Sequence, residues 1–417
     1  MIDIKKIIRQ RELVETKLLA RGYNKSLDEL IALYEKRNIL QKKEDELRHQ
    51  KKEKSTFMRY QEISEEMRIE MRNISQEIDK VAKEAKNIDS KITTSLLEIP
   101  NLILDDVPIS DRKEDSIKVY SFGKVNEFEF PISDHVSLAK NLRLIDFERA
   151  TKMAGSSFPL YFSKGAILEW SLINFMINYQ ISSGFNFVLP PILNNTRSLT
   201  ISGNLPKFAD QIYSCKDDDL HLIPTSEVPL TAFFSDELVN LDNGPIRLMA
   251  YTPNFRREAG SYGKRDQGLM RMHQFNKIET YSICQPSQSK EELEFLVENA
   301  RGILEKLGLH YRIANLPSCD LAQQSAKTYD IEIWLPFQKR YSEVSSASNC
   351  TDYQARRANI RFKLESDKGY VHTLNCSGLA TPRVMVALLE TYQTKDGGVI
   401  VPEVLREFTH FDEITLS

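Results

Sequence analysis

The 417-residue chain contains few cysteines, and their spacing argues against stabilisation by disulfides or by zinc. The five cysteines are odd in number and none forms a CxxC pair, so neither a disulfide framework nor a structural zinc site is indicated. His372 and Cys376 are close in sequence, but two candidate ligands do not make a metal site. We therefore expect a reducing compartment, the cytoplasm. The cysteines are Cys215, Cys284, Cys319, Cys350 and Cys376.

The chain also lacks a strong charge excess, a long apolar run and a P-loop. Its 56 Lys and Arg against 59 Asp and Glu leave a net charge of -3, so any surface for nucleic acid must be local. The N-terminal residues MIDIKKIIRQ have no long apolar core, and residues 166–181 are too short and polar to span a bilayer. We expect no secretory signal and no membrane. Because GxxxxGK[ST] is absent, ATP use cannot be inferred from that motif.

Glycine and proline are both absent from residues 27–97, which are densely charged. Apolar residues in the second half of this stretch alternate at spacings of four and three, and a thinner seven-residue seam runs through the first half. This heptad pattern predicts a long antiparallel two-helix coiled coil, turning near residues 55–61 and ending before Pro100. The seam residues are Leu33, Leu40, Leu47, Met67, Met71, Ile74, Ile78, Val81, Ala85, Ile88 and Ile92.

Charge is uneven along this arm. Residues 36–59 carry nine Lys or Arg against four acids, a local excess of +5. One interpretation is a solvated helix face. The other is a phosphate-binding arm, because clustered cations displace the counterions of a nucleic-acid backbone. The candidate contacts are Lys42, Lys43, Lys51 and Lys52.

From about residue 111 the pattern changes to short apolar alternations separated by turn residues, with helical stretches between them. We predict an α+β domain over 111–417, built on a mostly antiparallel sheet flanked by helices, after an N-terminal domain over 1–110. Trp170 and Trp334 are expected in its core. The expected helices are 164–181, 291–307 and 383–391, and two of the expected strands are 185–188 and 330–334.

One candidate site is a hairpin formed by residues 255–258 and 271–279, joined by a loop containing Gly260, Gly263 and Gly268. Alternation would place Arg256 and Glu258 on one face of the hairpin. Arginine forks suit phosphate, an aromatic ring suits a purine, and a carboxylate suits an ammonium or hydroxyl group. A solvated sheet face with cross-strand ion pairs is an equally valid interpretation of the hairpin alone. The facing residues would be Arg271, His273, Phe275, Lys277 and Glu279.

The hairpin resembles motif 2 of class II aminoacyl-tRNA synthetases. Three further runs resemble the seryl-tRNA synthetase family: TSE at 225–227, EVSSASNCTDYQARR at 343–357 and NCSGLATPR at 375–383. Pro190-Pro191 resembles the dimer-forming motif 1, so residues 164–191 are expected to form a two-fold interface. The family also begins with a long coiled-coil arm, and the resemblance therefore covers essentially the whole chain.

The resemblance implies roles for individual residues. The catalytic residues would be Arg256, Glu258 and Arg383. Magnesium, bound together with ATP, would be held by Glu343 and Ser346, which supply the hard oxygen ligands it prefers. Serine would be bound by Thr225, Ser226, Glu227, Arg256, Glu279, Asn375 and Ser377. ATP would be bound by Arg256, Arg257, Glu258, Arg271, Phe275, Glu343, Val344, Ser345, Ser346 and Arg383.

The chain departs from the family pattern at three positions, where Ala347 replaces a frequent cysteine and both Cys376 and Pro382 replace frequent glycines. Pro382 should be tolerated, because it falls at the start of the expected motif 3 helix, where its missing N–H is not needed. Ala347 reads as a packing variation and Cys376 as a small buried residue. Fine positioning of Ser377 and Arg383 is the aspect that these departures affect.

The implied reaction has two steps: serine and ATP form seryl-adenylate, and serine then passes to the terminal ribose of serine tRNA. A homodimer is expected, and a selenocysteine tRNA is allowed as a second substrate. Two alternatives stay open. One is a related class II enzyme for threonine or proline, and the other is a binding protein that kept the fold and lost catalysis.

Overall fold

A computed structural model describes residues 1–58, 64–259, 268–365 and 367–416. The chain forms two compact units. One comprises Ile2–Leu19 and Tyr23–Pro100, and the other comprises Met1, Ala20–Gly22 and Asn101–Ser417. The expected domain boundary near residue 110 stays a prediction.

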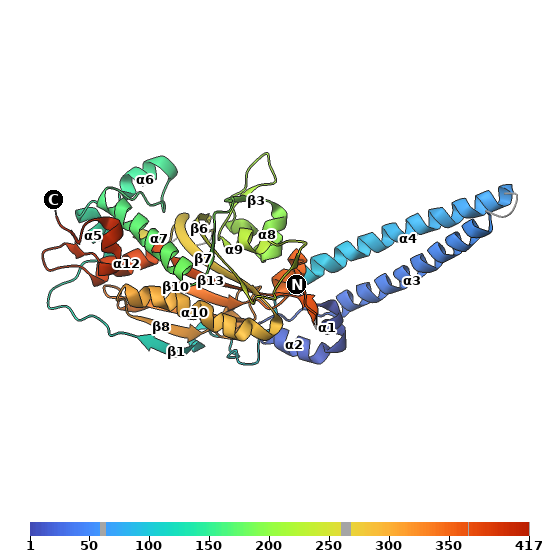
Figure 1. Cartoon of the computed structure of the whole chain (residues 1–417), viewed down its shortest axis with the longest axis horizontal. Coiled ribbons are helices and arrows are strands. Elements are labelled where there is room, and N and C mark those ends of the chain that lie inside the picture. The colour runs from blue at the N-terminus through green and yellow to red at the C-terminus, as the bar shows by residue number, and fades with distance from the viewer. Residues whose placement is uncertain (59–63, 260–267, 366, 417) are drawn as a thin grey trace. The chain divides into compact units, whose positions relative to one another are not determined.

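The first unit contains α1 (Ile4–Arg9), α2 (Arg11–Leu19) and the predicted hairpin of α3 (Asp28–Phe57) and α4 (Glu65–Glu98). These two long helices run side by side (Figure 1). The heptad seam is buried between them, most completely away from the turn, as the pattern predicts. Part of the expected turn, residues 59–61, lies outside the described residues. The buried seam residues are Leu40, Ile78, Val81, Ala85, Ile88 and Ile92.

Acidic side chains of α4 neutralise part of the positive charge on α3. Lys43 Nζ lies 2.6 Å from Glu77 Oε1, and Lys36 Nζ lies 2.7 Å from Glu84 Oε1. Such exposed pairs contribute roughly 0.2–1 kcal/mol each, so they matter more for the charge pattern than for stability. Among the described residues Lys42, Lys51 and Lys52 make no ion pair, and they carry the unbalanced charge.

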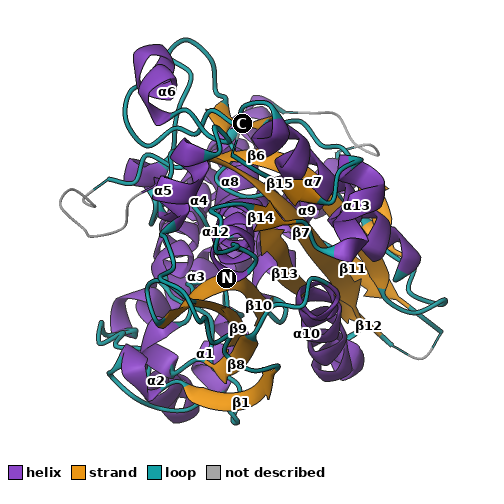
Figure 2. Ribbon diagram, turned by 90° about the vertical axis from the view of Figure 1, so that its left-hand side faces the viewer, coloured by secondary structure: helices purple, strands orange, loops and turns teal. Residues whose placement is uncertain are grey.

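The second unit is built on an eight-stranded sheet in the order β1-β8-β9-β10-β13-β7-β6-β2 (Figure 2). Among the described residues of this sheet, only β2 and β6 pair in parallel, which confirms the mostly antiparallel prediction. In sheet order, the strands are β1 (Ile117–Phe122), β8 (Tyr311–Asn315), β9 (Lys327–Leu335), β10 (Arg340–Asn349), β13 (His372–Ala380), β7 (Gln274–Cys284), β6 (Ile246–Phe255) and β2 (Asn186–Val188).

Alternation along the strands gives the sheet two different faces. The even residues of β7, such as Ile278, join the main core formed with helices α7 (Lys164–Ser182), α10 (Ser289–Lys306) and α12 (Thr381–Thr391). The odd residues, such as Tyr281, pack with α8 (Thr196–Ser202), α9 (Glu227–Ala232) and α11 (Tyr353–Ala358). Period-two alternation therefore separates Ile278 in the main core from residues 277 and 279 on the other face, while Phe275 near the start of β7 also packs against the main core.

The shorter elements lie at the periphery of this frame, and none of the described helices is long and apolar enough to cross a membrane. The remaining helices are α5 (His135–Asn141), α6 (Phe147–Ala154) and α13 (Glu403–Thr409), with short 3-10 turns at Lys113–Asp115, Ala209–Gln211, Gly268–Met270, Pro286–Gln288 and Ser318–Asp320. The remaining strands are β3 (Leu193–Asn194), β4 (His221–Leu222), β5 (Leu238–Val239), β11 (Arg361–Lys363), β12 (Lys368–Tyr370), β14 (Val399–Ile400) and β15 (Glu413–Ile414).

The prediction that Trp170 lies in the core was wrong, because Trp170 is 56% exposed on α7. Within the expected interface segment 164–191, the apolar residues of α7 do not all face outward. Leu168, Leu172, Phe175 and Met176 pack inside their own protomer. Only the other side of the helix, with Ile167 and Trp170, presents large apolar groups outward, because the helix must first cover the sheet.

Candidate active site

The β6–β7 hairpin is present, with Thr252 opposite Lys277 and Asn254 opposite Phe275. Its ladder is shorter than predicted, since β6 ends at Phe255 and β7 begins at Gln274. Arg256, Glu258 and Arg271 therefore lie just beyond the strands. Within β7 the expected alternation holds, and Phe275, Lys277 and Glu279 share one face. The loop glycines Gly260 and Gly263 lie outside the described residues.

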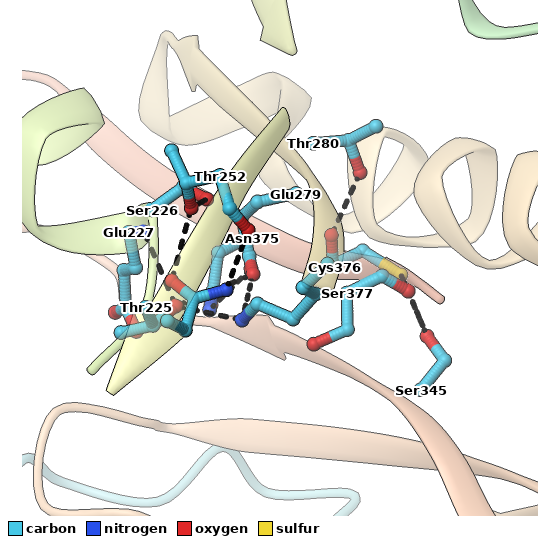
Figure 3. A network of polar contacts seen from close by, with 12 residues as sticks. Thr225, Ser226, Glu227, Thr252, Glu279, Thr280, Ser345, Asn375, Cys376 and Ser377 are labelled. Carbon is cyan, nitrogen blue, oxygen red and sulfur yellow. Dashed lines mark hydrogen bonds and ion pairs between the residues drawn. The ribbon is translucent and has the colours of Figure 1, made fainter. Parts of the chain in front are cut away.

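A buried polar cluster forms the floor of the site (Figure 3). Lys277 Nζ donates to Thr225 Oγ1 at 2.6 Å and pairs with the Glu279 carboxylate. Thr225 Oγ1 lies 3.4 Å from Glu279 Oε2, and Asn375 Nδ2 donates to Glu279 Oε1 at 3.4 Å. A carboxylate held in this way is a suitable partner for an ammonium or hydroxyl group of a small substrate. Three serine-binding candidates thus converge here around Lys277, which the sequence reasoning left without a role.

Glu227 lies in the same buried region but faces away from the open cavity. Gln354 Nε2 donates to its Oε1 at 2.6 Å and Gln324 Nε2 donates to the same oxygen at 3.1 Å. Burial, followed by the charge of Glu279, raises the pKa of Glu227 to about 7. Its backbone N–H donates to Thr225 Oγ1 at 3.2 Å. Glu227 is thus placed to hold Thr225 in position. The side-chain amides of Gln354 and Gln324 in turn hold Glu227.

Ser226 and Ser345 have buried hydroxyl groups that are already engaged. Ser226 Oγ lies 2.7 Å from Thr252 Oγ1, and Ser345 Oγ donates to the carbonyl of Ser377. Neither hydroxyl is therefore free to bind a substrate directly. Ser345 instead braces the strand that carries Ser377, and the buried Cys376 packs behind it (Figure 3).

An open cavity adjoins this cluster, and its walls carry the expected phosphate-binding groups. Arg271 Nε lies 2.6 Å from Glu258 Oε2, and Arg383 Nη1 lies 3.6 Å from Glu343 Oε2. Since these carboxylates hold the guanidinium groups in place, the arginines need little rearrangement to meet an anion. The cavity is lined by Arg256, Glu258, Leu269, Met270, Arg271, Met272, Phe275, Lys277, Glu343, Val344, Ser377, Ala380, Pro382 and Arg383.

Arg256 occupies the junction between the cavity and the buried cluster. Its Nε donates to the carbonyl of Pro224 at 3.2 Å, and its guanidinium carbon lies 5.1 Å from the centre of the Phe275 ring. The surrounding protein lowers the pKa of Arg256, while the carboxylates of Glu258 and Glu343 raise it. The residue still exposes part of its surface to the cavity, and it stays a cation. Glu258 beside it adopts φ 50°, an uncommon value outside glycine.

A third carboxylate lies behind the predicted magnesium ligands. Asp330 on β9 pairs in register with Ser346 on β10 and accepts a hydrogen bond from its side chain. Burial, followed by the charge of Glu343, raises the pKa of Asp330 well above its ordinary value. Its Oδ1 is buried and has no partner among the described residues. The sequence reasoning placed Asp330 on a strand but did not connect it with this site.

The motif 3 region begins with an irregularity that sets the position of Arg383. The β13–β7 register shifts between Ser377 and Ala380, and Leu379 adopts φ 91°. Helix α12 then starts at Thr381 with Pro382 in its first turn, which confirms the expectation for Pro382. A bulge of this kind re-aims the chain at the edge of a site.

Three of the residues expected to bind ATP, and the facing residue His273, do not line the open cavity. Arg257 is exposed and donates its backbone N–H to the Gln211 carbonyl at 2.9 Å. His273 Nδ1 lies 2.9 Å from the Arg256 carbonyl, as expected for a histidine with a structural hydrogen bond. Ser345 and Ser346 lie on β10 but do not line the cavity, whereas Glu343 and Val344 on the same strand do.

Comparison with known proteins agrees with this geometry. The family model "tRNA synthetase class II core domain (G, H, P, S and T)" matches residues 212–392, which include the β6–β7 hairpin and Arg383. The site and fold are thus those of a class II aminoacyl-tRNA synthetase. The model "Seryl-tRNA synthetase N-terminal domain" matches residues 1–103.

Full-length relatives define the family more closely. The Serine--tRNA ligase of Thermodesulfovibrio yellowstonii is 43% identical over 427 residues, covering 99% of this chain and 100% of that protein. That of Brachyspira hyodysenteriae is 42% identical, covering 99% of each. The crystal structure of Pyrococcus horikoshii seryl-tRNA synthetase complexed with ATP has a TM-score of 0.92 at 34% identity and covers 100% of both chains. The chain belongs to the seryl-tRNA synthetase family.

Proposed function

We propose that this chain activates serine with ATP and transfers it to serine tRNA. In the first step the serine carboxylate attacks the α-phosphate of ATP, and pyrophosphate leaves. In the second, a terminal ribose hydroxyl attacks the adenylate carbonyl and AMP leaves. The observation that carries this proposal is the junction at Arg256, which connects a cavity lined by paired arginines with a buried cluster suited to a small amino acid.

In the buried cluster, Glu279 would take the serine ammonium, and Thr225, Asn375 and Ser377 would surround the small side chain. The Glu279 carboxylate already accepts from Thr225 and Asn375 and pairs with Lys277, so it is preorganised for a cation or donor. Positioning and charge stabilisation by Arg256 would supply most of the rate, since the two steps need no covalent enzyme intermediate.

In the open cavity, Phe275 would stack on adenine against the apolar wall of Met270 and Met272. Arg271 and Arg383 would hold the outer phosphates, while Arg256 and Glu258 would meet the α-phosphate end. Sequence reasoning did not identify the methionine wall, because methionines at such spacing are usual in cores.

Magnesium fits the groups on β10. Glu343 and Ser346 offer a carboxylate and a hydroxyl, and Asp330 behind Ser346 accepts from that hydroxyl and has a second, buried oxygen without a partner among the described residues. When bound, the ion would neutralise charge on the ATP phosphates. Asp330 would accept a hydrogen bond from the Ser346 hydroxyl, and a lone pair of that hydroxyl oxygen would remain for the metal.

The direct test is serine-dependent exchange of labelled pyrophosphate into ATP by the full chain. Exchange with serine, but not with threonine or proline, supports the proposal. Exchange driven by another amino acid would identify a related class II enzyme. No exchange with any amino acid would point to a binding protein that has lost catalysis.

A homodimer is part of the proposal. The outward side of α7 and the strand after it expose Ile167, Trp170, Phe187 and Leu189, and Leu189 is 72% exposed. Apolar groups gathered in this way are typical of a protein interface. Sedimentation should show a dimer at micromolar concentration, and Trp170→Glu should shift it toward monomer. A monomeric parent would contradict the interface.

The arm would bind tRNA, and the cytoplasm is the proposed compartment because the substrates are found there and all five cysteines are unpaired. A selenocysteine tRNA, which shares the serine acceptor step, is proposed as a second substrate. Charging assays with each purified tRNA test that part independently of serine activation.

A further inference from the structure

Two short pieces of chain flank the segment that carries the α3–α4 hairpin, and both belong to the second unit. They are Ala20–Gly22 on one side and the stretch beginning at Asn101 on the other. Arg21 and Asn101, one from each piece, bind the backbone of the same loop, residues 321–325, shortly before β9. We call residues 321–325 the connector loop, because it joins both ends of the hairpin segment within the second unit.

The Arg21 guanidinium binds the connector loop through its backbone carbonyls. Its Nη2 donates to the carbonyls of Leu321 and Ala322 at 2.8 and 2.7 Å, and its Nη1 donates to that of Ser325 at 2.8 Å. Nη1 also donates to the Asn101 carbonyl at 3.0 Å. Burial lowers the pKa of Arg21 to about 10, so the group stays a cation at neutral pH. Because a charged donor makes stronger hydrogen bonds than a neutral one, Arg21 fixes the path of the loop.

Asn101 binds the two loop carbonyls that Arg21 leaves. Its backbone N–H donates to the Gln323 carbonyl at 2.8 Å, and its Nδ2 donates to the Gln324 carbonyl at 2.8 Å. Nδ2 also donates to the Cys350 carbonyl at 2.8 Å, and Asn101 itself is buried. Every backbone carbonyl of the connector loop therefore accepts a hydrogen bond from Arg21 or Asn101.

The side chain of Gln324 extends from this fixed backbone to Glu227. Its Nε2 lies 3.1 Å from Glu227 Oε1 and 3.5 Å from Oε2, and the side chain is buried. On α8's C-terminal side, Gly203 adopts φ 102°, and a Cβ there would lie 3.3 Å from the Gln324 amide oxygen. The amide is therefore packed closely against both Glu227 and Gly203, and a shift of the loop backbone would move it out of reach.

Glu227 connects Gln324 with the proposed serine site. The Glu227 N–H donates to Thr225 Oγ1 at 3.2 Å, and Thr225 Oγ1 lies 3.4 Å from Glu279 Oε2, the proposed partner of the serine ammonium (Figure 3). Neither Gln324 nor Glu227 lines the open cavity proposed for ATP. A displacement of Gln324 should therefore change the binding of serine more than the binding of ATP.

We propose that Gln324 is a positioning residue of the serine site, and that Arg21 and Asn101 set its place from the two ends of the hairpin segment. This inference rests on the proposed function and concerns residues that touch neither serine nor ATP. A buried carboxylate such as Glu227 is costly to leave short of donors. Loss of the Gln324 amide removes one of its two described amide donors, so the carboxylate and Thr225 next to it would shift.

Gln324→Met removes the amide, and Gln324→Asn keeps an amide that is too short to reach Glu227. Both changes should raise the KM for serine in pyrophosphate exchange about tenfold, because a hydrogen bond to a charged group is of that size. The KM for ATP should stay within about threefold of the parent. Gln393→Met is the matched control, since Gln393 is also buried and its Nε2 donates to the Ser133 carbonyl at 3.1 Å, outside the open cavity. This control should leave the KM for serine unchanged.

A double variant separates positioning from general damage. Arg21→Met alone should raise the KM for serine about three- to tenfold, because it releases carbonyls of the connector loop. Arg406→Met, which removes a donor to the Val401 carbonyl on α13's N-terminal side, should not. In Arg21→Met combined with Gln324→Met, the KM for serine should equal that of Gln324→Met alone, since the loop then has no amide left to position.

Three outcomes would overturn the inference. One is an unchanged KM for serine in both Gln324 variants, and another is an equal rise of the KM for serine and for ATP. The third is a double variant in which the two effects multiply, as independent sites do. Absence of serine-dependent exchange in the parent would instead overturn the proposed function.

Discussion

Glu169 Oε1 accepts a hydrogen bond from Asn276 Nδ2 at 2.9 Å. Thr381 Oγ1 donates to the same oxygen. The contact joins α7, which exposes Trp170 on its outer side, to β7 between Phe275 and Lys277 and to the first turn of α12. One buried carboxylate therefore holds together the three elements that correspond to motifs 1, 2 and 3.

Glu169 should make stability depend on pH. Burial raises the pKa of Glu169 to about 7, although the hydrogen bonds from Thr381 and Asn276 lower it. Because the folded state holds this proton more tightly than the unfolded state, its contribution is complete below about pH 4.5 and is lost as pH rises through 7. Relative to Glu169→Gln, the parent should lose about 3 kcal/mol of unfolding free energy between pH 4 and 8. Denaturant titrations at each pH measure this.

The exposed Glu298→Gln on α10 is the control for that series, since its side chain is 64% exposed. It should follow the parent at every pH. If the parent and Glu169→Gln kept a constant difference across the range, the pKa of Glu169 would be the same in the folded and unfolded chains, and the assigned burial effect would be wrong.

Arg256→Ala should lower kcat for serine activation by about 10²–10³, as the loss of one oxyanion-type donor does. Arg256→Lys should recover only part of this, because an ammonium cannot replace the guanidinium fork that meets both Pro224 and a phosphate. Arg361→Ala on β11, in the separate three-stranded sheet, is the matched arginine control. Near-normal exchange in a folded Arg256→Ala variant would exclude the proposed role.

The buried cluster should reject alanine. Asn375 and Ser377, which would surround the serine side chain, would lose a partner if the ligand had no hydroxyl, and sites built for a hydroxyl reject its absence by roughly 10⁴–10⁵. The extra methyl group of threonine should be refused for its size. Exchange rates with serine, alanine and threonine measure both ratios. Alanine activated within about tenfold of serine would contradict this account.

Lys277 should matter both for stability and for serine binding. Lys277→Met leaves the buried Glu279 without its cation, and breaking a buried pair in this way costs about 3–5 kcal/mol. The double variant with Lys277→Met and Glu279→Gln should recover much of that stability, because no buried charge is then left unpaired. It should nevertheless remain inactive. Thermal unfolding and exchange assays follow the two effects separately. Equal stability of the single and double variants would show that the pair is not coupled.

The arm should serve charging and not activation. Replacing Asp28 to Ser95 by a short Gly/Ser linker should leave pyrophosphate exchange within a few-fold, since the described active-site residues lie at Thr225 and beyond. It should reduce aminoacylation by orders of magnitude. A shortened, folded chain that charges tRNA with the parent kcat/KM would show that the arm is only a solvated coiled coil.

Within the arm, the unpaired lysines should contribute most to tRNA binding. Neutralising Lys42, Lys51 and Lys52 should weaken binding and reduce its salt dependence by roughly one unit of slope per lost contact. Lys43→Gln and Lys36→Gln should have smaller effects, because their charges are balanced by Glu77 and Glu84. Equal effects for paired and unpaired lysines would mean that the ion pairs open on binding.

Much of the fold could be predicted from the sequence, because its main elements carry a repeating pattern of side chains. The heptads of the arm and the alternation of Phe275, Lys277 and Glu279 each describe one element, and periodicity within an element survives any packing. The limits of β6 and β7 were less predictable, since a hairpin ladder ends where the two strands diverge and no residue type marks that point.

The sequence by itself determined the coiled-coil arm, the antiparallel hairpin, the tolerance of Pro382 and, through resemblance, the family and the residues proposed to carry the chemistry. Only the tertiary structure decided that Trp170 faces outward and that Lys277, Glu169 and Asp330 join the site from three different elements. It also decided which lysines of α3 form ion pairs with acidic residues of α4. These facts depend on contacts between segments far apart in the chain, which a local pattern does not encode.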